Sequence, residues 1–286
     1  MCTYNYGVRI DLHTHSLCSD GTDSPAQLVG KAKAAGLDVL GLTDHDTVRG
    51  WDEAARAAAE NSVRLVRGME LTTEYAGVSV HLLGYLFDPD NGAIRSHCAR
   101  MARERRERAQ KIAEKLARDF PFSFSEMAAR IPPGVPLGRP HIADELVRLG
   151  IVPNRSAAFA SLLSPGSKYY VRGYAAYTPE AIEWINNAGG KAVVAHPKAE
   201  KRGRVLPDAA LFALAEAGLF GVETDHRDHS ARSRRELSEL ARKAGLLRFG
   251  AGDYHGRGKP NRLGEYTTSA RVLEELRKNT FLPIAE

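Results

Sequence analysis

Short apolar stretches alternate with amphipathic ones along most of the chain. Seven apolar, β-rich stretches predict strands, at Val8–Leu12, Val39–Thr43, Arg64–Gly68, Val78–Gly84, Ala192–Ala195, Gly221–Glu223 and Leu247–Ala251. Between them the pattern predicts helices at Pro25–Ala35, Trp51–Asn61, Pro179–Ala188, Ala209–Ala217 and Arg232–Ala244. Several of these helices are followed by a glycine, the residue most favoured just beyond a helix end.

Strands that alternate with helices predict an α/β fold, with a mostly parallel sheet covered by helices. Seven strands suit a barrel related to the (β/α) TIM barrel better than a short open sheet. We therefore expect residues 1–87 and 174–286 to form the barrel.

Residues 88–173 break this alternation, because they contain no convincing strand pattern. Arg95–Asp119 predicts one long helix, since its apolar residues fall along one side. A proline-rich loop and two shorter helices, His141–Leu149 and Asn154–Leu163, follow it. We interpret 88–173 as a small helical insertion domain that shapes the substrate pocket.

Composition adds few constraints. The net charge of +5, from 40 Lys and Arg against 35 Asp and Glu, slightly favours an anionic substrate but does not by itself indicate nucleic acid. The three cysteines lack paired spacing, which favours reduced thiols. No segment reads as a membrane span or signal peptide, so we expect a cytoplasmic protein with no membrane contact and no obligate protein partner.

Histidines and acids recur at or near the strand ends. They are His13, His15, Asp44, His45, Glu70, His81, His196, Asp225, His226, Asp253 and His255. In a parallel barrel the carboxyl ends of the strands share one face, so these residues are expected to converge. Imidazole and carboxylate together suit first-row divalent ions. A single histidine of this kind is more often a hydrogen-bonded residue without a metal, but coincidence is a poor explanation for the whole set.

The spacing of these residues resembles the PHP (polymerase and histidinol phosphatase) family. The similarity is carried by seven motifs, in the family's order: Asp11–Ser16, Ser19–Gly21, Leu42–Asp46, Gly68–Glu70, Val80–Gly84, Ala195–Pro197 and Gly252–His255. The resemblance implies a distorted seven-stranded barrel and metal-dependent hydrolysis of phosphate esters. Asp20 stands where the histidinol-phosphatase branch usually has histidine, which favours the branch that resembles nucleotide phosphatases.

The resemblance also implies three metal positions. The first is formed by His13, His15, Glu70 and Asp253, the second by Glu70, His81 and His196, and the third by Asp20, His45 and His255. We expect two to three divalent ions, with Mn²⁺ first and Fe²⁺ or Zn²⁺ as alternatives. We expect the third position to be the most labile, because it contains Asp20 in place of the histidine usual in the histidinol-phosphatase branch.

The predicted insertion contains candidate phosphate contacts of its own. Arg139 and His141 lie at a predicted helix start, with Pro140 suited to its first position, and exposed amides there favour anions. Lys168 is placed to reach the same anion, and Arg202 and Arg204 lie on a loop after His196. For each, a solvated surface charge is the alternative. The arginines between Arg100 and Arg108 are interpreted as a solvated helical face, with Arg108 paired to Glu104.

The predicted reaction is attack of a metal-bridging hydroxide on phosphorus, with Glu70 bridging two ions and Asp225 or His226 orienting the nucleophile or protonating the leaving oxygen. The preferred substrate is a nucleotide phosphomonoester such as a 3′,5′-bisphosphonucleoside. Alternatives are a 5′-3′ exoribonuclease acting on short RNA, a phosphatase for another small metabolite and, in a different class, a non-catalytic metal-binding module.

Overall fold

Buried strands form the centre of the larger of two compact units. The computed structural model describes residues 7–200 and 203–286. The strands are β1 (Ile10–Asp11), β2 (Val39–Leu42), β3 (Arg64–Tyr75), β4 (Val78–Tyr85), β5 (Ala176–Tyr177), β6 (Lys191–Ala195), β7 (Gly221–Asp225) and β8 (Leu247–Gly250). All seven predicted strands are present, and the two-residue β5 is an addition.

The sheet has the order β1-β2-β3-β4-β6-β7-β8, with β5 pairing outside this path with β3. β1 to β3 are parallel to one another, and so are β6 to β8, but β4 is antiparallel to both β3 and β6. The reason is local. β3 continues beyond the predicted end at Gly68, and Ala76 and Gly77, with φ values of 50° and 72°, form a two-residue turn into β4. Such a turn joins antiparallel strands only.

The first and last strands approach each other through the segments that follow them. Thr14 and Tyr254 form a parallel bridge, and the His15 amide donates to the Tyr254 carbonyl at 2.9 Å. The sheet thus forms a nearly closed barrel of seven strands, as predicted. Inside it, the Tyr85 and Phe249 rings stack with centroids 6.1 Å apart, and both residues are buried.

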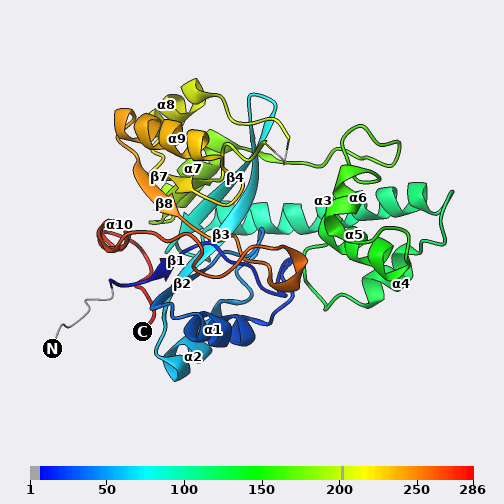
Figure 1. The fold of residues 1–286 in the computed structure, drawn as a ribbon, viewed down its shortest axis with the longest axis horizontal. Helices are drawn as coiled ribbons and strands as arrows, with labels where there is room; N and C mark the ends of the chain where they lie inside the picture. Colours follow the sequence, from blue (N-terminus) through cyan, green and yellow to red (C-terminus); the bar gives the residue numbers. More distant parts are fainter. Residues whose placement is uncertain (1–6, 201–202) are drawn as a thin grey trace. The chain divides into compact units, whose positions relative to one another are not determined.

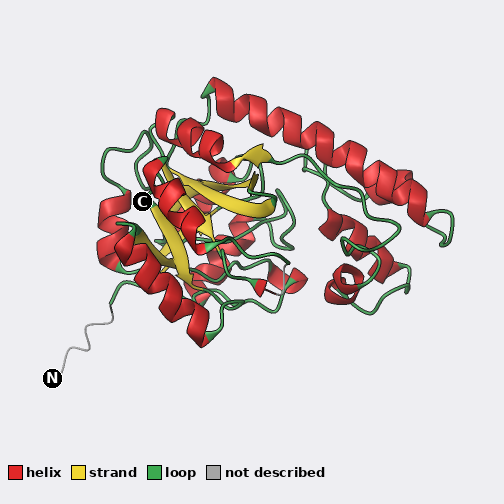
Figure 2. Cartoon of the chain, turned by 90° about the horizontal axis from the view of Figure 1, so that it is seen from above, coloured by secondary structure: helices red, strands yellow, loops and turns green. Residues whose placement is uncertain are grey.

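Helices surround these strands. They are α1 (Pro25–Ala34), α2 (Trp51–Asn61), α7 (Thr178–Asn187), α8 (Asp208–Glu216), α9 (Ala231–Lys243) and α10 (Ala270–Leu276), with a short 3₁₀ helix, η2 (Gly256–Gly258). In Figure 1, α1 and α2 lie below the strands and α7, α8 and α9 above them. Figure 2 shows the strands of this unit with helices around them. Gly36, Gly189, Gly218 and Gly245 follow helices with positive φ, as their positions predicted.

The second compact unit spans Ser96–Tyr174, between Arg95 and Ala175 of the barrel unit. It contains most of α3 (Gly92–Leu116), then α4 (Phe124–Ala129), α5 (Arg139–Arg148) and α6 (Arg155–Ala160). The sequence pattern missed α4 and placed Pro140 at the first position of α5, which Arg139 occupies. The core of this unit includes Ile112, Leu116, Ile142 and Leu146. None of the helices within 7–200 and 203–286 combines the length and apolarity of a membrane span.

Candidate metal centre

His13 and His15, which follow β1, lie side by side with both rings buried. Thr14, between them, faces the other way, and its hydroxyl donates to the Gly41 carbonyl at 2.6 Å. Alternate side chains of an extended chain share a face. The two imidazoles therefore point to the same place, and Nε2 of His13 lies 3.0 Å from Nε2 of His15.

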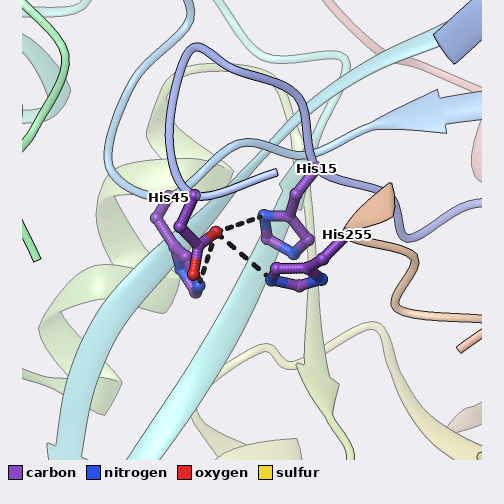
Figure 3. Close-up of side chains that lie close together, drawn as sticks. His15, His45 and His255 are labelled. Carbon is purple, nitrogen blue, oxygen red and sulfur yellow. Dashed lines mark ion pairs between the residues drawn. The ribbon is translucent and has the colours of Figure 1, made fainter. Parts of the chain in front are cut away.

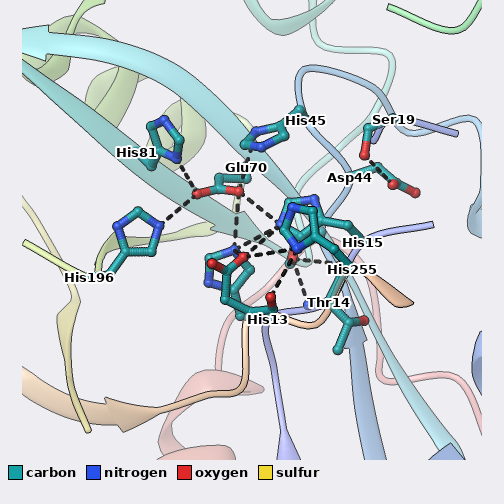
Figure 4. Close-up of polar contacts among 12 residues, drawn as sticks. His13, Thr14, His15, Ser19, Asp44, His45, Glu70, His81, His196 and His255 are labelled. Atoms are coloured by element: carbon teal, nitrogen blue, oxygen red, sulfur yellow. Dashed lines mark hydrogen bonds and ion pairs between the residues drawn. The ribbon is translucent and has the colours of Figure 1, made fainter. Parts of the chain in front are cut away.

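Glu70 lies at the centre of the cluster, 1% exposed, and its two oxygens face different sets of ring nitrogens (Figure 4). Oε2 lies 3.1 Å from Nε2 of His13 and 3.0 Å from Nε2 of His15. Oε1 lies 2.6 Å from Nδ1 of His81 and 3.3 Å from Nε2 of His196. A carboxylate held in this way is able to serve two neighbouring ions.

The antiparallel strand β4 brings His81 to Glu70. The ladder pairs Glu70 with Leu83 and Thr72 with His81, so that His81 is the diagonal neighbour of Glu70 across the two strands. On the other edge of β4, His81 pairs with Ala195, the residue before His196. One antiparallel strand thus positions a histidine between Glu70 and the end of β6.

Asp253 completes the group around His13 and His15. Its Oδ1 lies 3.4 Å from Nε2 of His13 and 3.3 Å from Nε2 of His15. Asp253 has a positive φ of 51°, and His196 has one of 30°. Such backbone conformations are costly for residues other than glycine and concentrate at functional sites.

A further group forms around Asp20, in the loop after β1. Oδ1 of Asp20 lies 3.2 Å from Nε2 of His255, 3.8 Å from Nδ1 of His15 and 3.9 Å from Nε2 of His45. His15, His45 and His255 converge in Figure 3. His15 therefore faces Asp20 with Nδ1 and Glu70 with Nε2, so it lies between two groups.

Among the residues that the structure describes, the donor atoms form three groups, each within 4.8 Å, that are able to hold divalent ions. They are His13, His15, Glu70 and Asp253; His15, Asp20, His45 and His255; and His45, Glu70 and His81. The first equals the set implied by the resemblance. The second adds His15 to the implied third set. In the last group His45 stands beside Glu70 and His81, while the implied ligand His196 lies 3.3 Å from the same Glu70 carboxylate.

The chemistry of the donors fits a metal. Nδ1 of His15, Nδ1 of His45 and Nε2 of His255 are buried and form no hydrogen bond within the described residues. Buried polar atoms normally have a partner. Ions held by these donors would supply one.

The environment also fixes the protonation of the rings. Burial lowers the pKa of His45 to about 3 and that of His255 to about 4, so both rings are neutral, as a ligand must be. Burial opposes the charge of His15 too, but hydrogen bonds to Asp253 and Glu70 raise its pKa to about 9. Glu70 itself is buried, yet His45, His13 and His81 hold its pKa well below its usual range.

Two buried acids support the ligands: Asp44, which the sequence placed among the strand-end residues without a role, and Glu223, which the sequence analysis did not single out. Glu223 on β7 accepts a hydrogen bond from Nδ1 of His13 at 2.8 Å through Oε1 and from the His196 amide at 2.8 Å through Oε2. Asp44 accepts bonds from the hydroxyls of Ser16 and Ser19, both at 2.6 Å, which hold the loop that carries Asp20. The available signal for Glu223 was its place at the end of the predicted strand Gly221–Glu223, although this position does not reveal which groups it contacts.

Of the two predicted proton-transfer residues, only His226 lies in the cluster. His226 is fully buried, and its ring centroid lies 5.2 Å from that of His196. Asp225 is exposed, because the pairing of β7 with β8 shifts register between Glu223 and Asp225. Its carboxylate accepts a hydrogen bond from the neighbouring Thr224 hydroxyl at 3.3 Å.

The predicted substrate contacts lie outside these groups. In the helical unit, Arg139 donates to the Leu163 carbonyl at 3.4 Å, and Nδ1 of His141 accepts from the Gly138 amide at 3.0 Å. Lys168 is 70% exposed and forms an ion pair with Asp119 at 2.9 Å. In the barrel unit, Arg204 is exposed and lies near the Gly77 turn. Arg202 falls outside the described residues.

Comparison with known proteins gives matches over most of the chain. The PHP domain profile matches residues 11–85. A 3′,5′-nucleoside bisphosphate phosphatase from Chromobacterium violaceum is 32% identical over 254 residues, which cover 88% of this chain and 89% of the relative. A 5′-3′ exoribonuclease from Haemophilus influenzae is 38% identical over 189 residues, which cover 66% of this chain and 69% of the relative.

A solved structure extends the similarity to the fold. A protein from Bifidobacterium adolescentis, assigned as a metal-dependent phosphoesterase, superposes with a TM-score of 0.91 at 39% identity. The match covers 94% of this chain and 96% of that one. The similarity therefore includes the residues between Arg95 and Ala175 as well as the barrel.

Proposed function

The chain belongs to the PHP family of metal-dependent phosphoesterases, and we propose that its substrate is a nucleotide phosphomonoester such as a nucleoside 3′,5′-bisphosphate. The observation that carries the hydrolytic part of this proposal is the division of the Glu70 carboxylate between two sets of histidines, which suits two ions acting on one phosphoryl group. The relative named as a bisphosphate phosphatase is aligned over 88% of this chain and 89% of its own length, whereas the exoribonuclease from Haemophilus influenzae is aligned over 66% and 69%.

We assign the metal ligands as His13, His15, Glu70 and Asp253 for one ion, Glu70, His81 and His196 for a second, and Asp20, His45 and His255 for a third. The mixture of imidazoles and carboxylates favours Mn²⁺, with Fe²⁺ and Zn²⁺ as alternatives. Bound divalent ions would polarise the phosphoryl oxygens and acidify water for attack on phosphorus. The protein holds His45 and His255 neutral and Glu70 anionic, because the pKa of each of these three groups is low.

His226 is the better candidate for holding a proton near the leaving oxygen. Its Nδ1 accepts a hydrogen bond from the Asp228 amide at 3.0 Å, so the ring proton of the neutral form belongs on Nε2. That Nε2 lies 3.6 Å from Oδ2 of Asp253 and forms no hydrogen bond within the described chain. A donor fixed in this way is suited to an oxygen that gains negative charge. Asp225, being exposed, is the weaker candidate.

Exoribonuclease activity on short RNA is the second candidate function, favoured by the 38% identity to the Haemophilus influenzae enzyme. Family membership disfavours a non-catalytic metal-binding module. Both candidate reactions cleave a phosphate ester and need the same metal ligands. They differ in whether the ester belongs to a terminal phosphate or to a phosphodiester.

One assay separates them. Protein loaded with Mn²⁺ is offered adenosine 3′,5′-bisphosphate and a 5′-phosphorylated trinucleotide, and both inorganic phosphate and mononucleotides are measured. Our proposal expects inorganic phosphate from the bisphosphate at the higher kcat/KM. Mononucleotides from the trinucleotide at a higher kcat/KM would favour the exoribonuclease, and no turnover of either compound with Mn²⁺, Fe²⁺ or Zn²⁺ would refute both.

A further inference from the structure

The backbone adopts an unfavourable conformation at His196, directly after β6. The φ of this residue is 30°, a region that residues other than glycine seldom occupy. Its imidazole lies 3.3 Å from the Glu70 carboxylate (Figure 4). Pro197 follows and has no amide hydrogen to donate. The next backbone donor along the chain is therefore the amide of Lys198, and its partner helps to decide how firmly His196 is held.

The Lys198 amide donates to the buried ring of His229, in the turn after β7. Nε2 of His229 accepts this hydrogen bond at 3.2 Å, and Nδ1 donates to the Thr224 carbonyl at 2.9 Å. His229 is 3% exposed, and its own amide donates to the His226 carbonyl at 3.1 Å. Both ring nitrogens thus have partners. Because one partner follows β6 and the other lies on β7, the ring links the ends of two paired strands.

These two partners allow a single form of the His229 ring. A backbone amide only donates and a carbonyl only accepts, so Nδ1 must carry the proton and Nε2 the lone pair. A proton on Nε2 would place two donors opposite each other. Burial lowers the pKa of His229, and the neighbouring His226 lowers it as well, so the ring is neutral at pH 7. His229 is therefore suited to be an uncharged connector between the two strand ends.

A second group of β7 holds the other side of Pro197. The Glu223 carboxylate accepts the His196 amide at 2.8 Å. The amides before and after Pro197 are thus both bonded to β7 or to the turn that follows it. The Lys198 side chain also donates to the Leu206 carbonyl at 3.0 Å, but a flexible side chain fixes the backbone less closely than a bond to the amide itself. The conformation of His196 therefore depends on acceptors from β7 and its turn.

We propose that His229 is a positioning residue for the metal ligand His196. By accepting the Lys198 amide, His229 holds the backbone from which the His196 imidazole reaches toward Glu70. Groups that orient metal ligands without touching the ion commonly set its affinity. The inference rests on the proposed assignment of His196 as a ligand. It makes His229 a determinant of one ion's affinity, with no contact of its own to ion or substrate.

Two substitutions separate the two contacts of the ring. His229→Gln places its amide group near the position of Nε2, where its oxygen accepts the Lys198 amide. His229→Asn places its amide group near the position of Nδ1, so it keeps a donor for Thr224 but is too short to reach Lys198. We expect His229→Asn to weaken one ion by roughly ten- to hundredfold, the usual effect of losing a group that orients a ligand, and His229→Gln to retain most of the affinity.

The measurement uses the full chain after metal has been removed with chelator, so that its result does not depend on turnover. Mn²⁺ is titrated by calorimetry and Co²⁺ by visible absorption. His196→Ala identifies the binding step that depends on His196, and His229→Asn should weaken that step alone. Lys198→Met is the matched control, because it removes the side-chain contact with Leu206 and keeps the amide, and it should bind as the wild type does. Melting curves without metal check that each variant folds.

Four outcomes would overturn the proposal. Wild-type affinity in His229→Asn would show that the ring does not position the ligand. Equal weakening of every step would show general damage, and equal weakening in His229→Asn and His229→Gln would show that the Lys198 contact is not the cause. No change of any step in His196→Ala would refute the ligand assignment itself. None of these results depends on whether the substrate is a bisphosphonucleotide or short RNA.

A measurement on the wild type needs no variant to fold. ¹⁵N NMR of the histidine rings at pH 7 should show His229 with a proton on Nδ1 and none on Nε2, as the two hydrogen bonds require. A proton on Nε2 would mean that the ring does not accept the Lys198 amide, and the proposal would fail on that result alone.

Discussion

Oε1 of Glu223 lies 2.8 Å from Nδ1 of His13, with both side chains fully buried. The other Glu223 oxygen accepts the amide of His196, also at 2.8 Å. The Glu223 carboxylate on β7 thus links His13, which follows β1, to His196, which follows β6. Because Nδ1–H of His13 donates a hydrogen bond to Glu223, the lone pair of the neutral His13 ring lies on Nε2, which faces Glu70 and Asp253.

Glu223→Gln is therefore expected to weaken metal binding while the fold is retained. An amide keeps one acceptor oxygen but turns its NH₂ group toward one of the two donors, His13 or the His196 amide. Loss of such a partner typically costs about ten- to hundredfold in metal affinity or activity. Metal titration by calorimetry measures the change, and Glu180→Gln, at an exposed acid of α7, is the control. Wild-type affinity in Glu223→Gln would show that this contact does not position the ligands.

Glu70→Ala is expected to remove most activity without unfolding the protein. Glu70 is the one carboxylate that contacts both sets of histidines in the proposed assignment, so its loss affects two ions. We expect kcat to fall by more than ~100-fold, since loss of a supporting partner alone costs up to that much. Metal content and phosphatase rate are measured on the same preparation. Normal content together with a normal rate would refute the bridging role.

The sequence predicts this barrel well because local patterns determine its parts. Glycines such as Gly36 and Gly245 mark helix ends, and the apolar runs mark the strands. The direction of β4 depends on the short Ala76–Gly77 turn, and the pattern of its residues is the same in either direction. The role of Glu223 depends on which strands become neighbours, as does the shift in β7 that exposes Asp225. These are properties of the assembled sheet, so no local pattern reveals them.

Metal binding is expected to release protons and to strengthen as the pH rises. Hydrogen bonds to Asp253 and Glu70 overcome the effect of burial and raise the pKa of His15 to about 9, so this ring is protonated at pH 7 in the ion-free protein. A ligand imidazole must be neutral, so each ion that binds His15 displaces a proton. Affinity should rise about tenfold per pH unit per proton released and level off above pH ~9.

The raised pKa of His15 also makes the stability of the ion-free fold depend on pH, but here stability falls as the pH rises. A raised histidine pKa stabilises the folded state fully below the unfolded value of ~6.5, and this contribution is lost as the pH rises through about 9. Calorimetry in buffers of different ionisation enthalpy measures the protons released on binding. An affinity independent of pH between 6 and 9 would contradict the assignment of His15 as a ligand.

The ion at Asp20 should be the most weakly held. Of the donors around it, His15 and His45 also face Glu70, so only Asp20 and His255 serve this group alone. Metal returned to stripped protein should bind in unequal steps, and Asp20→Ala should abolish only the weakest. Three equivalent tight sites, unaffected by Asp20→Ala, would contradict this prediction.

Arg139→Ala tests whether residues of the helical unit select the substrate. The metal ligands serve any phosphoryl group, so discrimination among phosphate esters needs contacts with another part of the substrate. Arg139, with His141 and Lys168, was predicted from the sequence to hold a second anionic group. The structure places Arg139 beside Arg105 and away from any acid that acts on its pKa within the described chain.

Loss of a charge-assisted hydrogen bond costs about 1.5–3 kcal/mol, or roughly ten- to hundredfold. We expect that decrease in kcat/KM for adenosine 3′,5′-bisphosphate, and a much smaller one for an aryl phosphate, which has no second anion. Measuring both on one variant separates recognition from damage to the metal centre, because damage lowers both rates alike. Equal losses would mean that Arg139 serves the reacting phosphate or the fold, and that selectivity arises elsewhere.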